Sequence, residues 1–110
     1  MSRLEEVFAS IDEKPQGKKC AAIEGILDEG KEIMDEYKGA PALDAGLISA
    51  AKAVEHYEIT RYGTLATWAD ELGNSTGARL LKATLAEEEN TDKALSDLAE
   101  GAVNQAAEAA

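Results

Sequence analysis

The chain has 110 residues, of which 45% are apolar, and this suits one domain with a core of its own. Its formal net charge of −11 at pH 7 disfavours both a nucleic-acid backbone and an anionic membrane surface as partners. The single cysteine, Cys20, excludes an internal disulfide, and no apolar run of about 18 residues is present that could span a membrane.

The first part of the chain predicts two modest helices. Its start is not typical of a signal peptide, and a cytoplasmic location is expected. Residues 2–11 place apolar side chains on one face of a short amphipathic helix. Residues 13–18, with Pro15 and Gly17, are typical of a loop. Residues 20–36 predict a second helix that Gly25 and Gly30 weaken, so we expect it to dock against a larger body.

Two long helices follow. The apolar pattern predicts one from about Leu43 to Leu72, ended by Gly73, and another from Ser75 or Thr76 to about Glu100. A connection this short makes the two helices antiparallel neighbours. We expect one all-α domain over residues 1–101 and a flexible tail over residues 102–110.

Acidic side chains interrupt the apolar stripes of both long helices. Glu55 and Glu58 lie about 15 residues before the turn, and Glu88 and Asp92 lie about 15 to 19 residues after it, so all four should meet at one level of the hairpin. Inward carboxylates from facing helices are typical of dinuclear metal sites in helical bundles. The alternative is that the run from Glu87 to Glu89 is solvated, and that Glu55 and Glu58 pair with Lys52 or Arg61.

Three segments resemble the YciE/YciF family of ferritin-like stress proteins. Its third-helix signature is similar to VEHYEI at 54–59 followed by YGT at 62–64, and its fourth-helix signature is similar to TLAEEENTDKAL at 84–95. The small connecting helix is similar to KPQGKKC at 14–20 with AIEG at 22–25. These segments occur in family order and, together, cover nearly the whole chain.

The resemblance implies a ferritin-like four-helix bundle with a dinuclear metal centre of iron or, alternatively, manganese. Glu55, Glu58, Glu88 and Asp92 are then the metal ligands. The chain lacks a counterpart of the family's first helix and of most of its second. We therefore expect either that a homodimer or higher homo-oligomer completes the bundle, or that another chain supplies the missing half.

Other residues near the acidic cluster have simpler expected roles. His56 is turned by about 100° from Glu55 and should lie beside the ligands or at the surface. Tyr62, Tyr57 and Trp68 are expected to pack, and Cys20 should be a small buried apolar residue. Two functions stay open: ferroxidase or peroxide-scavenging chemistry at a metal, and a non-catalytic helical module for self-association that has lost the metal.

Overall fold

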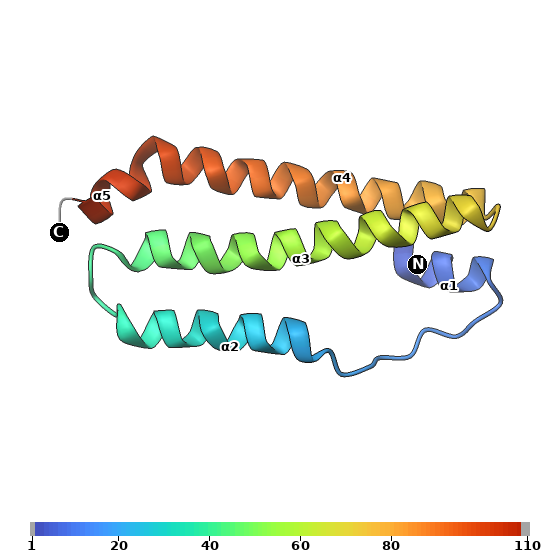
Figure 1. Ribbon diagram of the computed structural model, residues 1–110, viewed down its shortest axis with the longest axis horizontal. Coiled ribbons are helices and arrows are strands. Elements are labelled where there is room, and N and C mark those ends of the chain that lie inside the picture. The colour runs from blue at the N-terminus through green and yellow to red at the C-terminus, as the bar shows by residue number, and fades with distance from the viewer. Residues whose placement is uncertain (1, 109–110) are drawn as a thin grey trace.

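The structure, a computed structural model, describes residues 2–108, and within this range every regular element is a helix (Figure 1). The molecule is elongated, with extents of 53 × 28 × 23 Å. Its elements are α1 (Arg3–Ser10), α2 (Ala21–Glu36), α3 (Leu43–Glu71), α4 (Ser75–Leu98), the π-helical turn η1 (Ala99–Val103) and α5 (Asn104–Glu108). The four helices predicted from the sequence are confirmed.

An antiparallel hairpin of α3 and α4 runs the length of the molecule (Figure 1). Its turn needs a left-handed residue, and Gly73 supplies it with φ = +74°. Asn74 then begins α4, because its Oδ1 accepts a hydrogen bond of 2.9 Å from the Gly77 backbone N–H. Lys82 on α4 pairs with Asp70 on α3 at 2.8 Å and bridges the two helices near this turn.

The end of the chain differs from the sequence prediction. The fourth helix was expected to stop near Gly101, but the backbone passes through the π-helical turn η1 and continues as α5 to Glu108. The alanine-rich sequence favours helix, and a single π turn accommodates Gly101 without ending the helical segment. Flexibility of residues 102–110 stays a prediction, and residues 109–110 lie outside the described part of the chain.

The core is small and is built largely from alanine. Its main cluster lies beside the hairpin turn, where Val7 and Tyr62 pack against it, and consists of Ala66, Ala69, Ala78 and Leu81. Small side chains let two helices approach closely, which buries backbone as well as side chain. The expected packing role of Tyr62 is thereby confirmed.

Helix α1 is fastened to the hairpin at both of its ends. At its start, the Arg3 guanidinium contacts the Glu87 carboxylate of α4 at 2.6 Å. At its end, the Asn74 side-chain amide donates a hydrogen bond of 3.0 Å to the Ser10 hydroxyl. These contacts fix α1 against α4 rather than against its sequence neighbour α2 (Figure 1).

Helix α2 lies along α3, and glycines shape this contact. A Cβ atom on Gly30 would meet the Ala50 Cβ at an ordinary 3.6 Å, whereas one on Gly46 would lie 2.8 Å from the Ile33 Cγ2. The expected docking of this helix on a larger body is therefore confirmed. Cys20 was expected to be buried, but it is only partly buried: its sulfur caps α2 and lies 3.1 Å from the Tyr57 hydroxyl oxygen.

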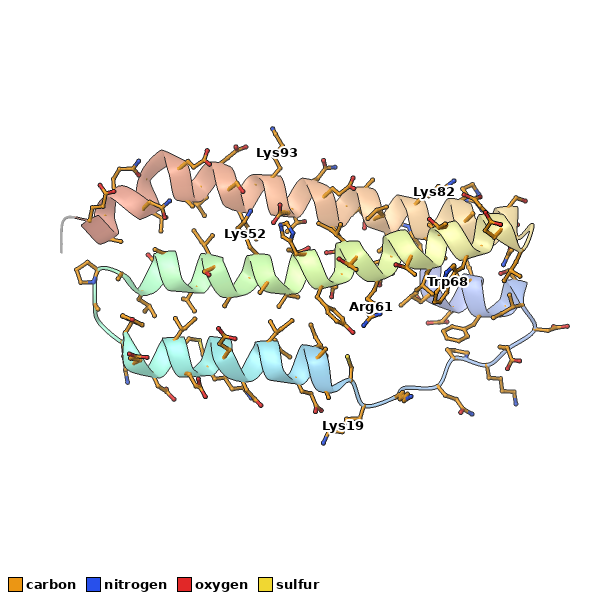
Figure 2. All side chains as sticks on the ribbon, in the orientation of Figure 1. Lys19, Lys52, Arg61, Trp68, Lys82 and Lys93 are labelled. Atoms are coloured by element: carbon orange, nitrogen blue, oxygen red, sulfur yellow. The ribbon has the colours of Figure 1, made fainter. Side chains whose placement is uncertain are left out.

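Several large apolar side chains remain open to solvent at the hairpin end. Trp68 is 60% exposed and Leu72 is 84% exposed, and Ile11 and Leu65 on neighbouring turns are also exposed. The sequence prediction that Trp68 packs is wrong for the single chain, since its side chain lies at the surface beside α1 (Figure 2). Among residues 2–108, no helix is long and apolar enough to cross a membrane.

The glycine contact between α2 and α3 gives a first testable prediction. Gly63→Ala should raise the free energy of unfolding by roughly 0.5–1 kcal/mol, because alanine favours helix and its Cβ meets nothing within 4 Å. Gly46→Ala should lack this gain or destabilise, because the added Cβ would lie 2.8 Å from the Cγ2 of the stiff, β-branched Ile33 side chain, which would have to move. Urea denaturation of both variants measures the difference, and equal gains would contradict the close approach of α2 and α3.

Candidate metal centre

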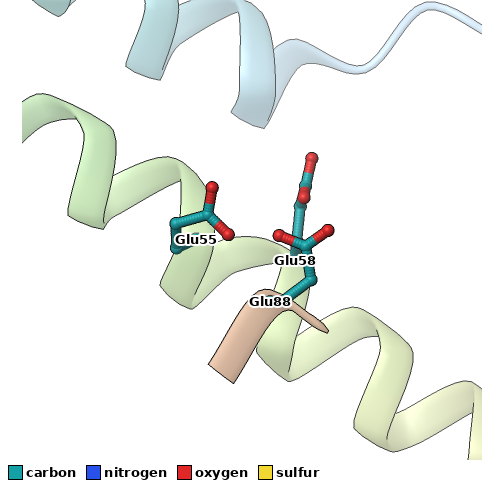
Figure 3. A group of neighbouring side chains, drawn as sticks. All are labelled: Glu55, Glu58 and Glu88. Atoms are coloured by element: carbon teal, nitrogen blue, oxygen red, sulfur yellow. The ribbon is translucent and has the colours of Figure 1, made fainter. Parts of the chain in front are cut away.

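Three glutamates from two helices meet at mid-length of the hairpin. Glu55 and Glu58 are one turn apart on α3, and Glu88 faces them from α4 (Figure 3). One carboxylate oxygen from each lies within 4.8 Å of the others. The antiparallel count from the turn places them at the same level, and this part of the sequence prediction agrees with the geometry.

The electrostatics of the three-glutamate cluster oppose full ionisation. Burial, together with the neighbouring Glu88 carboxylate, raises the pKa of Glu58 above its usual range. The pKa of Glu88 is also raised, first by a shared hydrogen bond with Glu55 and then by burial. One oxygen of Glu55, Oε2, is buried and has no hydrogen-bond partner among residues 2–108. The cluster therefore favours a shared proton or a cation.

The basic side chains that could neutralise these glutamates have other partners. Lys52 lies between α3 and α4, where its ammonium contacts the Asp92 carboxylate at 3.0 Å and the Ser96 hydroxyl (Figure 2). Arg61 lies over the ring of Tyr57, 5.2 Å from its centroid. Within residues 2–108, neither cation forms an ion pair with Glu55 or Glu58, so the paired alternative considered for the sequence is wrong.

Asp92, the fourth predicted ligand, is not a member of the three-glutamate cluster. Its Oδ1 lies 3.0 Å from both the Lys52 ammonium and the His56 Nε2. These are close ion-pair contacts whose angles fall outside good hydrogen-bond geometry. The contact with Lys52, followed by the charge of His56, lowers the pKa of Asp92. Asp92 is thus a carboxylate that already has a counter-ion in Lys52.

His56 and Tyr62 are the other two side chains that the sequence singled out near the cluster. The His56 ring is 64% exposed and touches Asp92, in keeping with the position expected for it beside the ligands or at the surface. Burial, and then the charges of Glu58 and Glu88, raises the pKa of the Tyr62 phenol. Tyr62 therefore keeps its proton next to the carboxylates.

Sequence reasoning missed the group formed by Lys52, His56, Asp92 and Ser96. Its signal was present as two pairs at i, i+4, Lys52 with His56 on α3 and Asp92 with Ser96 on α4. Only the relative rotation of the two helices shows that these pairs face each other. Three hard oxygen donors that have no basic partner within residues 2–108, beside a neutralised fourth, are a donor set that fits a divalent cation.

The chain has clear relatives among known proteins. Residues 1–108 match the model of a family described as "Domain of unknown function (DUF892)". The chain is 46% identical over 109 residues to protein YciF of Escherichia coli strain K12, which covers 98% of this chain and 66% of that protein.

Two solved structures are also similar. The crystal structure of the E. coli stress protein YciF matches with a TM-score of 0.86 at 47% identity, covering 93% of this chain and 65% of that chain. YcfI from Rhodopseudomonas palustris matches with a TM-score of 0.81 at 44% identity, covering 86% of this chain and 60% of that one. The chain thus spans less than two thirds of the length of these relatives.

These matches confirm the family resemblance drawn from the residues at 14–25, 54–64 and 84–95. They also confirm the expected fold, which is all-α and ferritin-like, with the α3–α4 hairpin as its main body. The chain belongs to the DUF892 family, together with the stress protein YciF.

Proposed function

We propose that this protein binds a divalent metal ion through Glu55, Glu58 and Glu88. The observation that carries the proposal is the meeting of three carboxylates within 4.8 Å, with one buried Glu55 oxygen that has no partner. A buried carboxylate is costly unless it is protonated, paired or bound to a metal. Because no basic side chain in the described part of the chain pairs with Glu55 or Glu58, a cation is the most favourable partner at neutral pH.

Iron is the proposed ion, with manganese as the alternative, since both accept carboxylate oxygens. The three glutamates would hold the ion and release the proton that the cluster otherwise shares. Bound iron would supply redox chemistry toward dioxygen or peroxide, which corresponds to ferroxidase or peroxide-scavenging activity in a cytoplasmic stress protein. A second ion would require more ligands, and Asp92 can join only if its contacts with Lys52 and His56 break.

Assembly into a homodimer or higher homo-oligomer is part of the proposal. A hairpin with a small alanine core and several large exposed apolar side chains gains from burying them against a second copy. A two-fold pair of hairpins would supply four long helices, the number found in ferritin-like bundles. The same exposed side chains favour the second candidate function, a helical self-association module that does not use a metal.

Metal binding is tested with matched glutamate variants. Wild-type protein should bind Mn²⁺ in calorimetry, and aerobic Fe²⁺ should give a rapid ferric absorbance. Glu88→Gln should weaken Mn²⁺ binding at least tenfold and abolish the absorbance change, because it removes one of three ligands. Glu89→Gln is the control: it removes the same charge from an exposed neighbouring position and should leave binding within twofold. Equal effects of the two variants would contradict a site at the cluster.

The cluster should also affect stability in the absence of metal. The raised pKa values of Glu58 and Glu88 mean that the folded protein binds more protons than the unfolded chain. The free energy of unfolding therefore falls as pH rises from the pKa of these glutamates in the unfolded chain through their higher pKa in the folded protein. Glu88→Gln should raise the free energy of unfolding at pH 7 by roughly 0.5 kcal/mol, by relieving like-charge repulsion.

The stability gain of Glu88→Gln should vanish below about pH 4, where the carboxyl groups are protonated in both the folded and the unfolded protein. Urea denaturation in a metal chelator at both pH values, with Glu89→Gln beside it, measures the effect. A loss of stability at pH 7, or the same gain at both pH values, would show that the carboxylates do not repel one another in the fold.

Self-association is expected under both candidate functions, and metal binding separates them. Sedimentation should give at least twice the monomer mass of 11.6 kDa. Trp68→Ala with Leu72→Ala should shift the protein toward monomer, because both side chains are exposed apolar surface in one chain. If Glu55→Gln with Glu88→Gln leaves this mass unchanged while wild-type protein binds no iron or manganese, the module without a metal is the correct function.

A further inference from the structure

Lys52 lies one helical turn before Glu55 on α3, and among residues 2–108 its ammonium forms no ion pair with the three-glutamate cluster. It lies 3.0 Å from Asp92 and also donates a hydrogen bond to Ser96, so both of its partners are on the facing helix α4. The Lys52 side chain is 30% exposed and that of Asp92 is 19% exposed, which makes this the most buried of the ion pairs among residues 2–108. The attraction between Lys52 and Asp92 is therefore screened less by water and salt than that of a surface pair.

Asp92 would otherwise be well placed to bind an ion. It lies one helical turn after Glu88, and a turn of 3.6 residues keeps i and i+4 on the same face of α4. What separates the two carboxylates is their partners. Glu88 faces two glutamates, whereas Asp92 faces Lys52 and His56.

We propose that Lys52 is a positioning residue that holds Asp92 away from the ion bound by Glu55, Glu58 and Glu88, so that three protein carboxylates hold this ion rather than four. The proposal rests on the function proposed above. A carboxylate that is neutralised by an ammonium must lose that partner before it can bind a metal. Lys52 thereby limits how many ligands each chain supplies, and hence how tightly the ion is held.

The test is a double-mutant cycle read by Mn²⁺ calorimetry on the full chain. Lys52→Met should tighten Mn²⁺ binding at least tenfold, because Asp92 then keeps only its contact with the His56 ring, which is 64% exposed and can turn away into solvent. Asp92→Asn should change the affinity less than twofold in the wild-type background but at least tenfold in the Lys52→Met background. If the two charges acted independently, Asp92→Asn would change the affinity by the same factor in both backgrounds. A larger factor in the Lys52→Met background therefore identifies Asp92 as a released ligand.

Two further variants control for charge and for folding. Lys52→Arg keeps a cation opposite Asp92 and should bind as wild type does. Lys93→Met removes a cation from an exposed position on the outer side of α4 and should also leave the affinity within twofold (Figure 2). Circular dichroism on each variant establishes that the helices are retained.

The outcomes separate this inference from the proposed function. If the effects of Lys52→Met and Asp92→Asn are additive while Mn²⁺ binding still depends on Glu88, only the role of Lys52 is overturned and the metal site stands. A large effect of Asp92→Asn in the wild-type background would also overturn that role, since Asp92 would then already be a ligand. Mn²⁺ binding that does not occur, or that ignores Glu88→Gln, would overturn both the site and the role of Lys52.

Discussion

The repulsion between three carboxylates at one level of the α3–α4 seam is the constraint on which the rest of this structure depends. Toward the hairpin turn the seam is lined by alanine and leucine, which pack without cost, and on the other side it holds the Lys52–Asp92 pair before Ile48 and Ala99 are buried. Glu55, Glu58 and Glu88 interrupt it and share a region too small for three free negative charges. The cluster is tolerable with a shared proton, and more favourable still with a divalent cation.

The nearby charges are arranged around this constraint. Lys52, the cation closest in sequence to Glu55 on the same helix face, is directed to Asp92 and Ser96 on α4. Arg61, one turn beyond Tyr57, is directed to the ring of that tyrosine. Both basic groups that could have neutralised the glutamates are thus used elsewhere. In the described part of the chain, the carboxylates of this site therefore keep their negative charge unpaired, which is the polarity that a metal ion requires.

The packing of a single copy supports the proposed assembly with a second one. Two long helices with small residues at their contact bury little side-chain area, and no polar or charged residue in the described range is fully buried. Helices α1 and α2 cover separate parts of the hairpin. Helix α1 is held through the contacts of Arg3 and Asn74, and α2 packs closely against Gly46 of α3. Trp68 and Leu72 stay exposed in one copy, and the proposed assembly would bury them against a second one.

Much of this could be predicted from the sequence, and the exceptions have physical causes. Apolar periodicity with Gly73 gives the hairpin, and counting from the turn brings Glu55, Glu58 and Glu88 together. The partner of Asp92 could not be predicted, because a helix rotation of a few tens of degrees decides whether it faces the glutamates or Lys52. The helical end of the chain was missed because Gly101 normally ends a helix, whereas here a π turn absorbs it.

The most direct test of the central claim is an anomalous difference map from crystals of the whole protein grown with Mn²⁺. The account expects a single strong peak at the α3–α4 seam, bonded to carboxylate oxygens of Glu55, Glu58 and Glu88, with Asp92 still paired with Lys52. A map without a peak at that level, with the three side chains turned to solvent or hydrogen-bonded only to one another, would contradict it.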